Sequence, residues 1–230
     1  RYADALRCAD HHSIYKNGAK EIAAQEGMAI SYMAKYNERE GNSCHIHFSL
    51  ADAEGPLFQR DQATFDSFLA GQLAYARELT LLLAPNVNSY KRYAVGSFAP
   101  TTIAWGHDNR TCAFRVVGHG PGLRFESRSG GADLNPYMAL AALIAAGLEG
   151  VEQGLALEPA FEGNAYAATD RPRLPATLRD ALDLFAASSV ARGAFGDDVV
   201  EHYANAAAVE LIAFEAAVTD WERVRGFERL

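Results

Sequence analysis

Arg124-Phe-Glu-Ser-Arg128 is the stretch of sequence that decides the fold. In a β-strand, alternate side chains point to opposite faces, so Arg124, Glu126 and Arg128 emerge together on one face. Three charges on one face of an interior strand cost too much free energy to be explained as packing, so we expect charged groups opposite them. The run therefore predicts one half of an active site for phosphate and carboxylate chemistry.

Two other segments show the same alternation. In Cys44–Ser49, the period of two puts His45, His47 and Ser49 on one face, and a third segment carries Arg115 on the face opposite its apolar side chains. A polar sheet face is usually solvated. Solvated faces favour Lys, Thr and Glu, however, so histidines and arginines that recur on three strands favour a lined cavity.

The rest of the chain alternates short strands with long helices. We predict helices at 1–26, 65–83, 135–154, 178–194 and 197–223, strands at 28–35, 44–50, 112–117 and 123–127, and loops at 87–104 and 156–175. This pattern indicates an α+β fold in which short, antiparallel strands are packed by helices on one side. Residues 1–155 are expected to form the sheet and active-site core, and 156–230 a C-terminal helical part.

Composition narrows the class of protein. A chain of 230 residues is long enough for one sizeable domain with its own core. Its formal net charge of -8 argues against a nucleic-acid-binding surface, although clustered arginines can still bind a small anion. The chain begins at Arg1, without methionine and inside an amphipathic pattern, so we interpret it as a fragment of a longer protein.

Cysteine usage and hydropathy point to a cytoplasmic location. Cys8, Cys44 and Cys112 are widely spaced and form no Cys-x-x-Cys pair, which fits a reducing compartment better than a disulfide framework. The longest apolar stretch is too short to span a bilayer, so no membrane partner is expected.

Glu126 has two interpretations. It could belong to an ion-pair network with the neighbouring arginines, or its oxygens could bind a hard cation such as Mg²⁺ or Mn²⁺, with His45 as a second ligand. Planar guanidinium groups match carboxylate and phosphate oxygens, so several arginines within one segment favour an anionic substrate. The arginines concerned are Arg92, Arg110, Arg115, Arg124 and Arg128.

Taken together, these segments resemble the glutamine synthetase family over nearly the whole chain. The motifs that carry the resemblance are Gly41-Asn-Ser-Cys-His-Ile-His-Phe-Ser-Leu50, Ala84-Pro-Asn-Val-Asn-Ser-Tyr-Lys-Arg92, Asp108-Asn-Arg-Thr-Cys-Ala-Phe-Arg115, Arg124-Phe-Glu-Ser-Arg128 and Asn135-Pro-Tyr137. The resemblance implies the C-terminal part of a catalytic domain, truncated at its N-terminus. In such a domain an antiparallel curved sheet forms a partial barrel with helices packed on its outer face.

The resemblance also implies an activity and a set of roles. It implies a ligase that phosphorylates the side-chain carboxylate of glutamate with ATP, after which a nitrogen nucleophile displaces phosphate. It implies the following roles: His45 and Glu126 bind Mg²⁺ or Mn²⁺; His47, Ser49, Arg115 and Arg124 line the ATP site; Arg110 and Arg128 act in catalysis; and Arg92, Arg128, Arg110 and Gly41 bind substrate. The full-length protein is expected to form a homo-oligomeric ring, and the fragment alone is expected to be inactive because the remaining metal-binding glutamates lie upstream.

Phe98 departs from the pattern of the ammonia-using members, which carry a glutamate there. A phenyl ring cannot accept a proton and attracts a cation only weakly through its face. Relatives with Ser97-Phe-Ala-Pro100 resemble γ-glutamyl ligases for amines such as polyamines or ethanolamine, so we predict that an organic amine is favoured over ammonia. Two alternatives remain: an ordinary glutamine synthetase in which another residue replaces the missing carboxylate, and a non-catalytic structural or regulatory relative.

Overall fold

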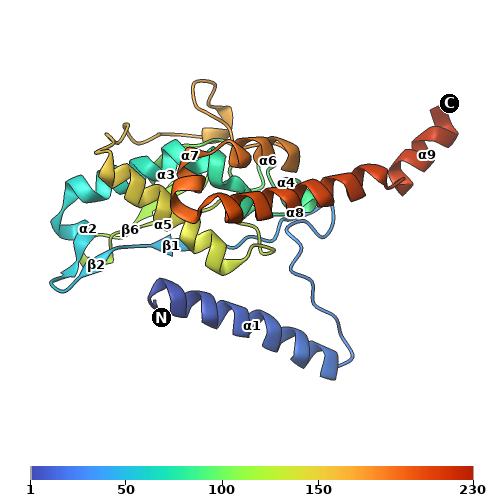
Figure 1. The fold of residues 1–230 in the computed structure, drawn as a ribbon, viewed down its shortest axis with the longest axis horizontal. Helices are drawn as coiled ribbons and strands as arrows, with labels where there is room; N and C mark the ends of the chain where they lie inside the picture. The colour runs from blue at the N-terminus through green and yellow to red at the C-terminus, as the bar shows by residue number, and fades with distance from the viewer. Residues whose placement is uncertain (1, 230) are drawn as a thin grey trace.

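Helices pack against a four-stranded sheet in the computed structural model, which describes residues 2–229 (Figure 1). The helices are α1 Ala5–Gln25, α2 Leu57–Arg60, α3 Gln62–Leu83, α4 Val87–Tyr90, α5 Pro136–Glu152, α6 Leu178–Ala186, α7 Ser189–Phe195, α8 Asp197–Ala216 and α9 Asp220–Arg229. The strands are β1 Ile46–Phe48, β2 Ala51–Asp52, β3 Gly55–Pro56, β4 Trp105–His107, β5 Phe114–Val117 and β6 Arg124–Ser127. Short 3₁₀ turns occur at Gly120–Gly122 and Ala165–Ala167.

The sheet has the strand order β1-β6-β5-β4. Both neighbours of β6 run antiparallel to it, and the register places His47 and Arg115 directly opposite Glu126. The predicted antiparallel pairing holds for these three strands, but β4 runs parallel to β5, which makes the sheet mixed. The sheet is open rather than a closed barrel, with β1 and β4 at its edges within residues 2–229.

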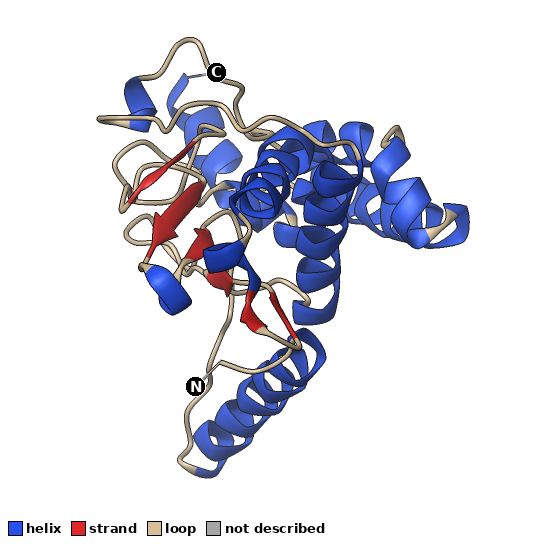
Figure 2. Cartoon of the chain, turned by 90° about the vertical axis from the view of Figure 1, so that its left-hand side faces the viewer, coloured by secondary structure: helices blue, strands red, loops and turns tan. Residues whose placement is uncertain are grey.

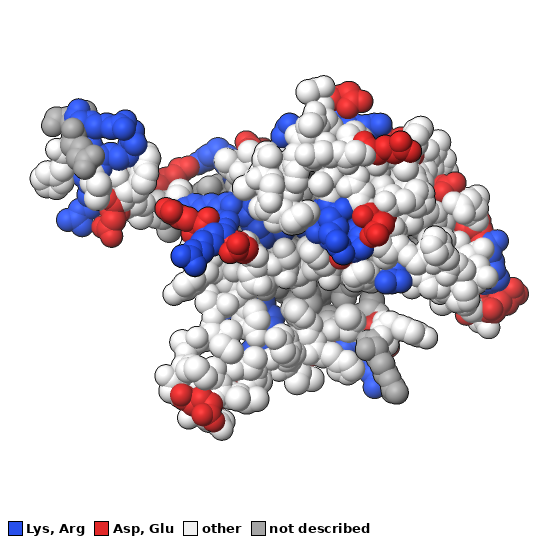
Figure 3. Space-filling view, turned by 180° about the vertical axis from the view of Figure 1, so that it is seen from behind, with Lys and Arg blue, Asp and Glu red and all other residues white. Residues whose placement is uncertain are grey.

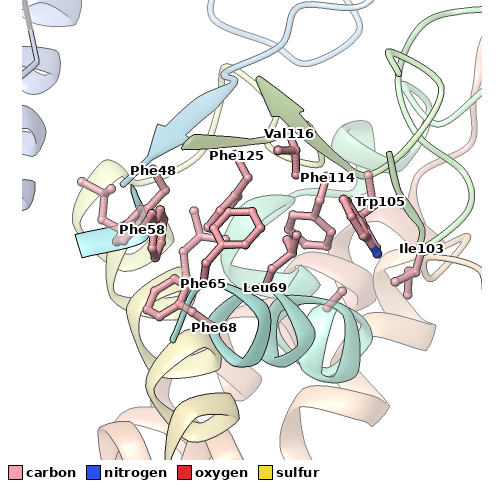
Figure 4. Packing of buried hydrophobic residues seen from close by; sticks show 14 of the residues in the cluster. Phe48, Phe58, Phe65, Phe68, Leu69, Ile103, Trp105, Phe114, Val116 and Phe125 are labelled. Carbon is pink, nitrogen blue, oxygen red and sulfur yellow. The ribbon is translucent and has the colours of Figure 1, made fainter. Parts of the chain in front are cut away.

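One face of the sheet is covered by an aromatic core. Phe48, Phe125 and Phe114 point from the strands toward α3, where they meet Phe65 and Phe68 (Figure 4). The ring of Phe48 stacks on those of Phe68 and Phe125, with centroids 5.5 and 5.8 Å apart. Such pairs add about 0.5–1.5 kcal/mol each beyond the burial of their area. The predicted apolar face for helices is thus confirmed.

The helices α3 and α5 approach each other closely because glycine lies on both. A Cβ atom on Gly71 would sit 2.1 Å from the carbonyl oxygen of Ala146, and one on Gly150 would sit 2.3 Å from that of Ser67. Real Cβ atoms do not come so near to backbone oxygen. The two helix backbones therefore touch at a distance that alanine would not allow.

Four predicted elements differ from the observed ones. The predicted loop 87–104 begins with the short helix α4, Val87–Tyr90, which starts where Ser89 Oγ accepts a hydrogen bond from the Asn86 amide at 3.0 Å. Residues 28–35 form irregular backbone instead of a strand, with Met28 63% exposed. The predicted helix 178–194 is interrupted before Ser188, whose side chain accepts a hydrogen bond from the Ala191 amide at 3.0 Å and so begins α7. The predicted helix 197–223 ends at Ala216, and Thr219, which hydrogen-bonds Glu222, precedes α9.

None of the described helices combines the length and apolarity that a bilayer crossing requires. Figure 2 shows α1 at the lower edge of the body that holds the sheet, where Ala9 packs into the core and Lys16 Nζ donates to the carbonyl oxygen of Ala132 at 2.7 Å. Basic and acidic side chains are interspersed on the face seen in Figure 3.

Candidate active site

Glu126 is the centre of the polar face of the sheet. It is 4% exposed, and its position in β6 places it between His47 on β1 and Arg115 on β5. Its Oε1 atom lies 3.3 Å from His45 Nδ1 and 3.4 Å from His47 Nε2. The alternation of the sequence predicted that these side chains share a face, and the structure brings them into contact.

The second oxygen of Glu126 is held by two arginines. Oε2 accepts hydrogen bonds from Arg128 Nη1 at 2.6 Å and from Arg115 Nη1 at 3.2 Å. Burial by itself would raise the pKa of Glu126, but the hydrogen bond and positive charge of Arg128, together with the bond from Arg115, outweigh it and lower the pKa. Glu126 is therefore an ionised carboxylate at neutral pH.

His45 is a neutral imidazole in this environment. Burial, followed by the positive charge of Arg128, lowers the pKa of His45 to about 4, although Glu126 acts in the opposite direction. A neutral imidazole nitrogen can bind a metal ion, whereas a protonated one cannot. A nitrogen and an oxygen 3.3 Å apart can both reach one cation at bond lengths of about 2.0–2.2 Å.

This pair fits part of a divalent-cation site. No group of three or more His, Cys, Asp or Glu side chains suited to a cation occurs within residues 2–229. The described chain thus offers His45 and Glu126 as donors and leaves the rest of an octahedral shell to water, phosphate oxygens or groups outside it.

Arg124 orients the second histidine. Its Nε donates a hydrogen bond to His47 Nδ1 at 3.2 Å, so the ring proton of His47 lies on Nε2, the atom that faces Glu126. Arg115 is fixed at its other side by Asp108, whose Oδ1 accepts from Arg115 Nε at 2.8 Å. The predicted phosphate-binding side chains of β1, β5 and β6 therefore lie side by side.

Ser49 does not join this cluster. It lies just beyond β1 and is exposed, and its side chain makes no hydrogen bond with the cluster within the described residues. Its predicted contact with ATP stays a prediction.

Arg92 lies behind the cluster instead of within it. It is 1% exposed, and its guanidinium donates to Ser43 Oγ at 3.1 Å and to the carbonyl oxygens of Arg128 and Ser129. A Cβ atom on Gly41 would lie 2.5 Å from Arg92 Cγ, so glycine at position 41 makes room for this side chain. The Nη1 and Nη2 donors of Arg92 are occupied by protein groups, whereas its buried Nε has no hydrogen-bond partner among the described residues, and its predicted contact with glutamate stays a prediction.

Arg110 lies apart from the Glu126 cluster, on the loop between β4 and β5. It lines an open pocket of about 550 Å³. The other lining residues are Phe98, His107, Asp108, Asn109, Thr111, Ala160, Phe161, Glu162 and Gly163.

Phe98 connects this pocket to the cluster. Its carbonyl oxygen accepts a hydrogen bond from Arg128 Nη2 at 3.2 Å, while its ring is 59% exposed at the pocket wall. Its φ of 57° lies in the left-handed region, which is unusual for a residue other than glycine.

Sequence reasoning missed Asp108 and Glu162 as site residues. Asp108 lies two residues before the predicted Arg110, and its negative charge was a signal for a partner of an arginine. Glu162 lies in an irregular segment with no periodic pattern, so only the tertiary structure brings it into the pocket.

Comparison with known proteins gives one consistent result. Residues 1–225 match the family model described as glutamine synthetase, catalytic domain. Over 100% of this chain and 50% of the relative, the sequence is 60% identical to a gamma-glutamylethanolamide synthetase of Streptomyces coelicolor. It is 41% identical to a glutamate–isopropylamine ligase of a Pseudomonas species, over 98% of this chain and 51% of the relative.

A solved structure of GmaS in complex with ADP has the same fold. It superposes with a TM-score of 0.91 at 32% sequence identity, covering 99% of this chain and 56% of the other. The chain therefore spans about half the length of the curated relatives that it matches.

Proposed function

Because the chain belongs to the glutamine synthetase family, we propose that the whole protein is an ATP-dependent carbon–nitrogen ligase. It phosphorylates the side-chain carboxylate of glutamate and joins the resulting γ-glutamyl phosphate to a primary organic amine, giving a γ-glutamyl amide and phosphate. The proposal extends to the whole protein, of which this chain is one part.

The grouping of charges around Glu126 is the observation that carries the proposal. Phosphoryl transfer depends on positioning and on positive charge more than on covalent participation of the protein. Arg115 and Arg128 are fixed by Glu126 within a few ångströms of each other, and Arg124 is fixed by His47. In the proposal, Arg115, Arg124, His47 and Ser49 bind the nucleotide.

Enzymes of this family use ATP and a divalent metal. His45 and Glu126 would hold one such cation, Mg²⁺ or Mn²⁺, beside the nucleotide phosphates. Such a cation, when bound, would neutralise phosphate charge and polarise the phosphoryl group. Arg110, which has no side-chain partner in residues 2–229, is free to face that phosphoryl group.

The proposal also assigns the residues that bind glutamate. Arg92 and Arg128 would bind its carboxylates, with the loop at Gly41 receiving it. Residues 1–155 would supply the sheet and the site, and 156–230 the helical part. The full-length protein would be a cytoplasmic ring-forming enzyme whose isolated C-terminal half is inactive.

The preference for an organic amine rests on Phe98 and on the relatives. A phenyl ring offers apolar contact to a carbon chain and no proton acceptor. A relative named for γ-glutamylethanolamide synthesis and one named for isopropylamine both support the assignment.

A panel of nitrogen donors tests the proposal directly. The full-length protein with glutamate, ATP and Mg²⁺ is expected to release ADP faster with ethanolamine, a polyamine or isopropylamine than with ammonium at equal concentration. Equal or better turnover with ammonium would identify an ordinary glutamine synthetase. Failure to bind nucleotide in a calorimetric titration would identify a non-catalytic relative.

A further inference from the structure

The pocket around Arg110 contains a negative charge that the proposed roles leave unused. Of its charged side chains, Asp108 is held by Arg115. Arg110 and Glu162 have neither an ion-pair nor a side-chain hydrogen-bond partner in the part of the chain that the structure describes. One free cation and one free carboxylate thus share a single open pocket.

Glu162 is held in place although it belongs to an irregular segment. On one side of it, the Phe161 amide donates to the carbonyl oxygen of Trp105 in β4 at 2.8 Å. On the other side, Asn109 Nδ2 donates to the carbonyl oxygen of Gly163 at 2.9 Å. Two anchors that flank a residue restrict where its side chain can go, which favours a binding role over a purely solvated one.

The wall of the pocket near these charges is apolar. Phe98, Ala160 and Phe161 line it together with Glu162. A water molecule, which is close in size to ammonium, takes up about 30 Å³ of liquid. The pocket holds about 550 Å³, so an ammonium ion alone would leave the two rings without a partner.

The pocket and the Glu126 cluster share a boundary. Arg128 contacts Glu126 through Nη1 and the carbonyl oxygen of Phe98 through Nη2. Arg115 likewise joins Glu126 to Asp108, which lines the pocket. A ligand in the pocket is therefore next to the groups proposed to handle phosphate.

We infer that this pocket is the binding site of the nitrogen donor, with Glu162 as the carboxylate that binds its ammonium group. Phe98 and Phe161 contact the carbon chain of a short primary alkylamine, and Arg110 faces the anionic end of the activated glutamate. The inference rests on the proposed ligase function and assigns the negative charge that Phe98 itself cannot supply.

Steady-state kinetics of the full-length protein test the inference, with ethanolamine as the varied substrate. The variant Glu162→Gln is expected to raise the KM for ethanolamine about tenfold, the lower end for a hydrogen bond to a charged group, while the KM values for glutamate and ATP change by less than about twofold. Glu162→Asp, which keeps the charge on a shorter side chain, is expected to recover part of the loss.

Asp170→Asn is the matched control. It removes the same charge from an exposed position in the same irregular segment, outside the pocket wall. Its KM for ethanolamine should equal that of the unmodified protein. Because Glu162 is exposed, both variants should also keep the melting temperature of the parent.

Three results would overturn the inference: an unchanged KM for ethanolamine in Glu162→Gln, the same increase in Asp170→Asn, or equal increases in the KM for glutamate and ATP. Each of these leaves the ligase function standing, because the parent protein is active in the same assay. If the parent releases no ADP with any amine, the proposed function and the inference both fail.

Discussion

Replacing Glu126 by glutamine should expose how strongly the polar cluster depends on one buried charge. The substitution keeps the shape of the side chain and removes its negative charge. Arg115 would keep Asp108 as a partner, but Arg128, which is 3% exposed, would lose the carboxylate that binds its Nη1 at 2.6 Å. No other carboxylate contacts Arg128 within residues 2–229.

The expected loss of stability follows from these contacts. Breaking a buried ion pair by removing one partner costs about 3–5 kcal/mol, because the other charge stays buried. The amide oxygen of glutamine can still accept one hydrogen bond from Arg128, and a bond to a charged donor recovers a share of the loss. We therefore expect Glu126→Gln to lower the free energy of unfolding by about 2–3 kcal/mol at neutral pH.

The pH dependence has a definite sign. The pKa of Glu126 is lowered in the folded state, so its stabilising contribution is present above the unfolded value and is lost as the pH falls through the folded value. The difference in the free energy of unfolding between the parent and Glu126→Gln should stay constant from neutral pH down to about 5. It should narrow only below about 4.3, the ordinary pKa of a glutamate.

Urea denaturation of the full-length parent and variant, at one protein concentration and with a chelator present, measures this difference in the free energy of unfolding. Glu215→Gln is the matched control, because Glu215 and its partner Arg179 are each 55% exposed and their pair should contribute at most about 1 kcal/mol. A difference in the free energy of unfolding below about 0.5 kcal/mol at neutral pH, or one that widens as the pH falls, would refute the reasoning.

The remaining predictions concern the cation and the helix contact. His45→Ala should weaken binding of Mn²⁺ to the full-length protein at least about tenfold in a calorimetric titration, as loss of a ligand or its support does; unchanged affinity would remove His45 from the cation site. Gly71→Ala should lower the free energy of unfolding by more than about 2 kcal/mol, since its Cβ would meet a backbone oxygen that cannot move aside. Gly18→Ala in α1 is its control: with no atom within 4 Å of the new Cβ, it should leave stability unchanged or raise it by up to about 1 kcal/mol, and similar losses in both variants would contradict the packing argument.

The polar face could be predicted because it depends on local alternation. A strand with Glu126 at its centre needs only the period of two to set its charges against the apolar core, and the same rule places His47 on the matching face of β1. The long helix α5 could also be predicted, because Asn135 followed by proline is a strong signal for the start of a helix. In the structure, the Asn135 side chain accepts a hydrogen bond from the Tyr137 amide at 3.0 Å.

Other features depend on contacts distant in sequence. The strand β4 has three residues and is defined by its parallel pairing with β5 and by the Phe161 amide, neither of which leaves a periodic pattern. The segment 28–35 alternates as a strand would, but alternation alone does not form a strand without a partner to complete its hydrogen bonds. Ser188 offered a usable signal for the break before α7, because serine is a common first residue of a helix.

Arg128 donates its hydrogen bond to the main-chain oxygen of residue 98, so this contact does not depend on which side chain residue 98 presents to the Arg110 pocket. A new side chain at position 98 therefore leaves the hydrogen bond to the Glu126 cluster unchanged, provided that it tolerates a left-handed backbone, which disfavours β-branched residues. Substitution of the single residue 98 can therefore change the wall of the Arg110 pocket among related proteins without moving Arg128.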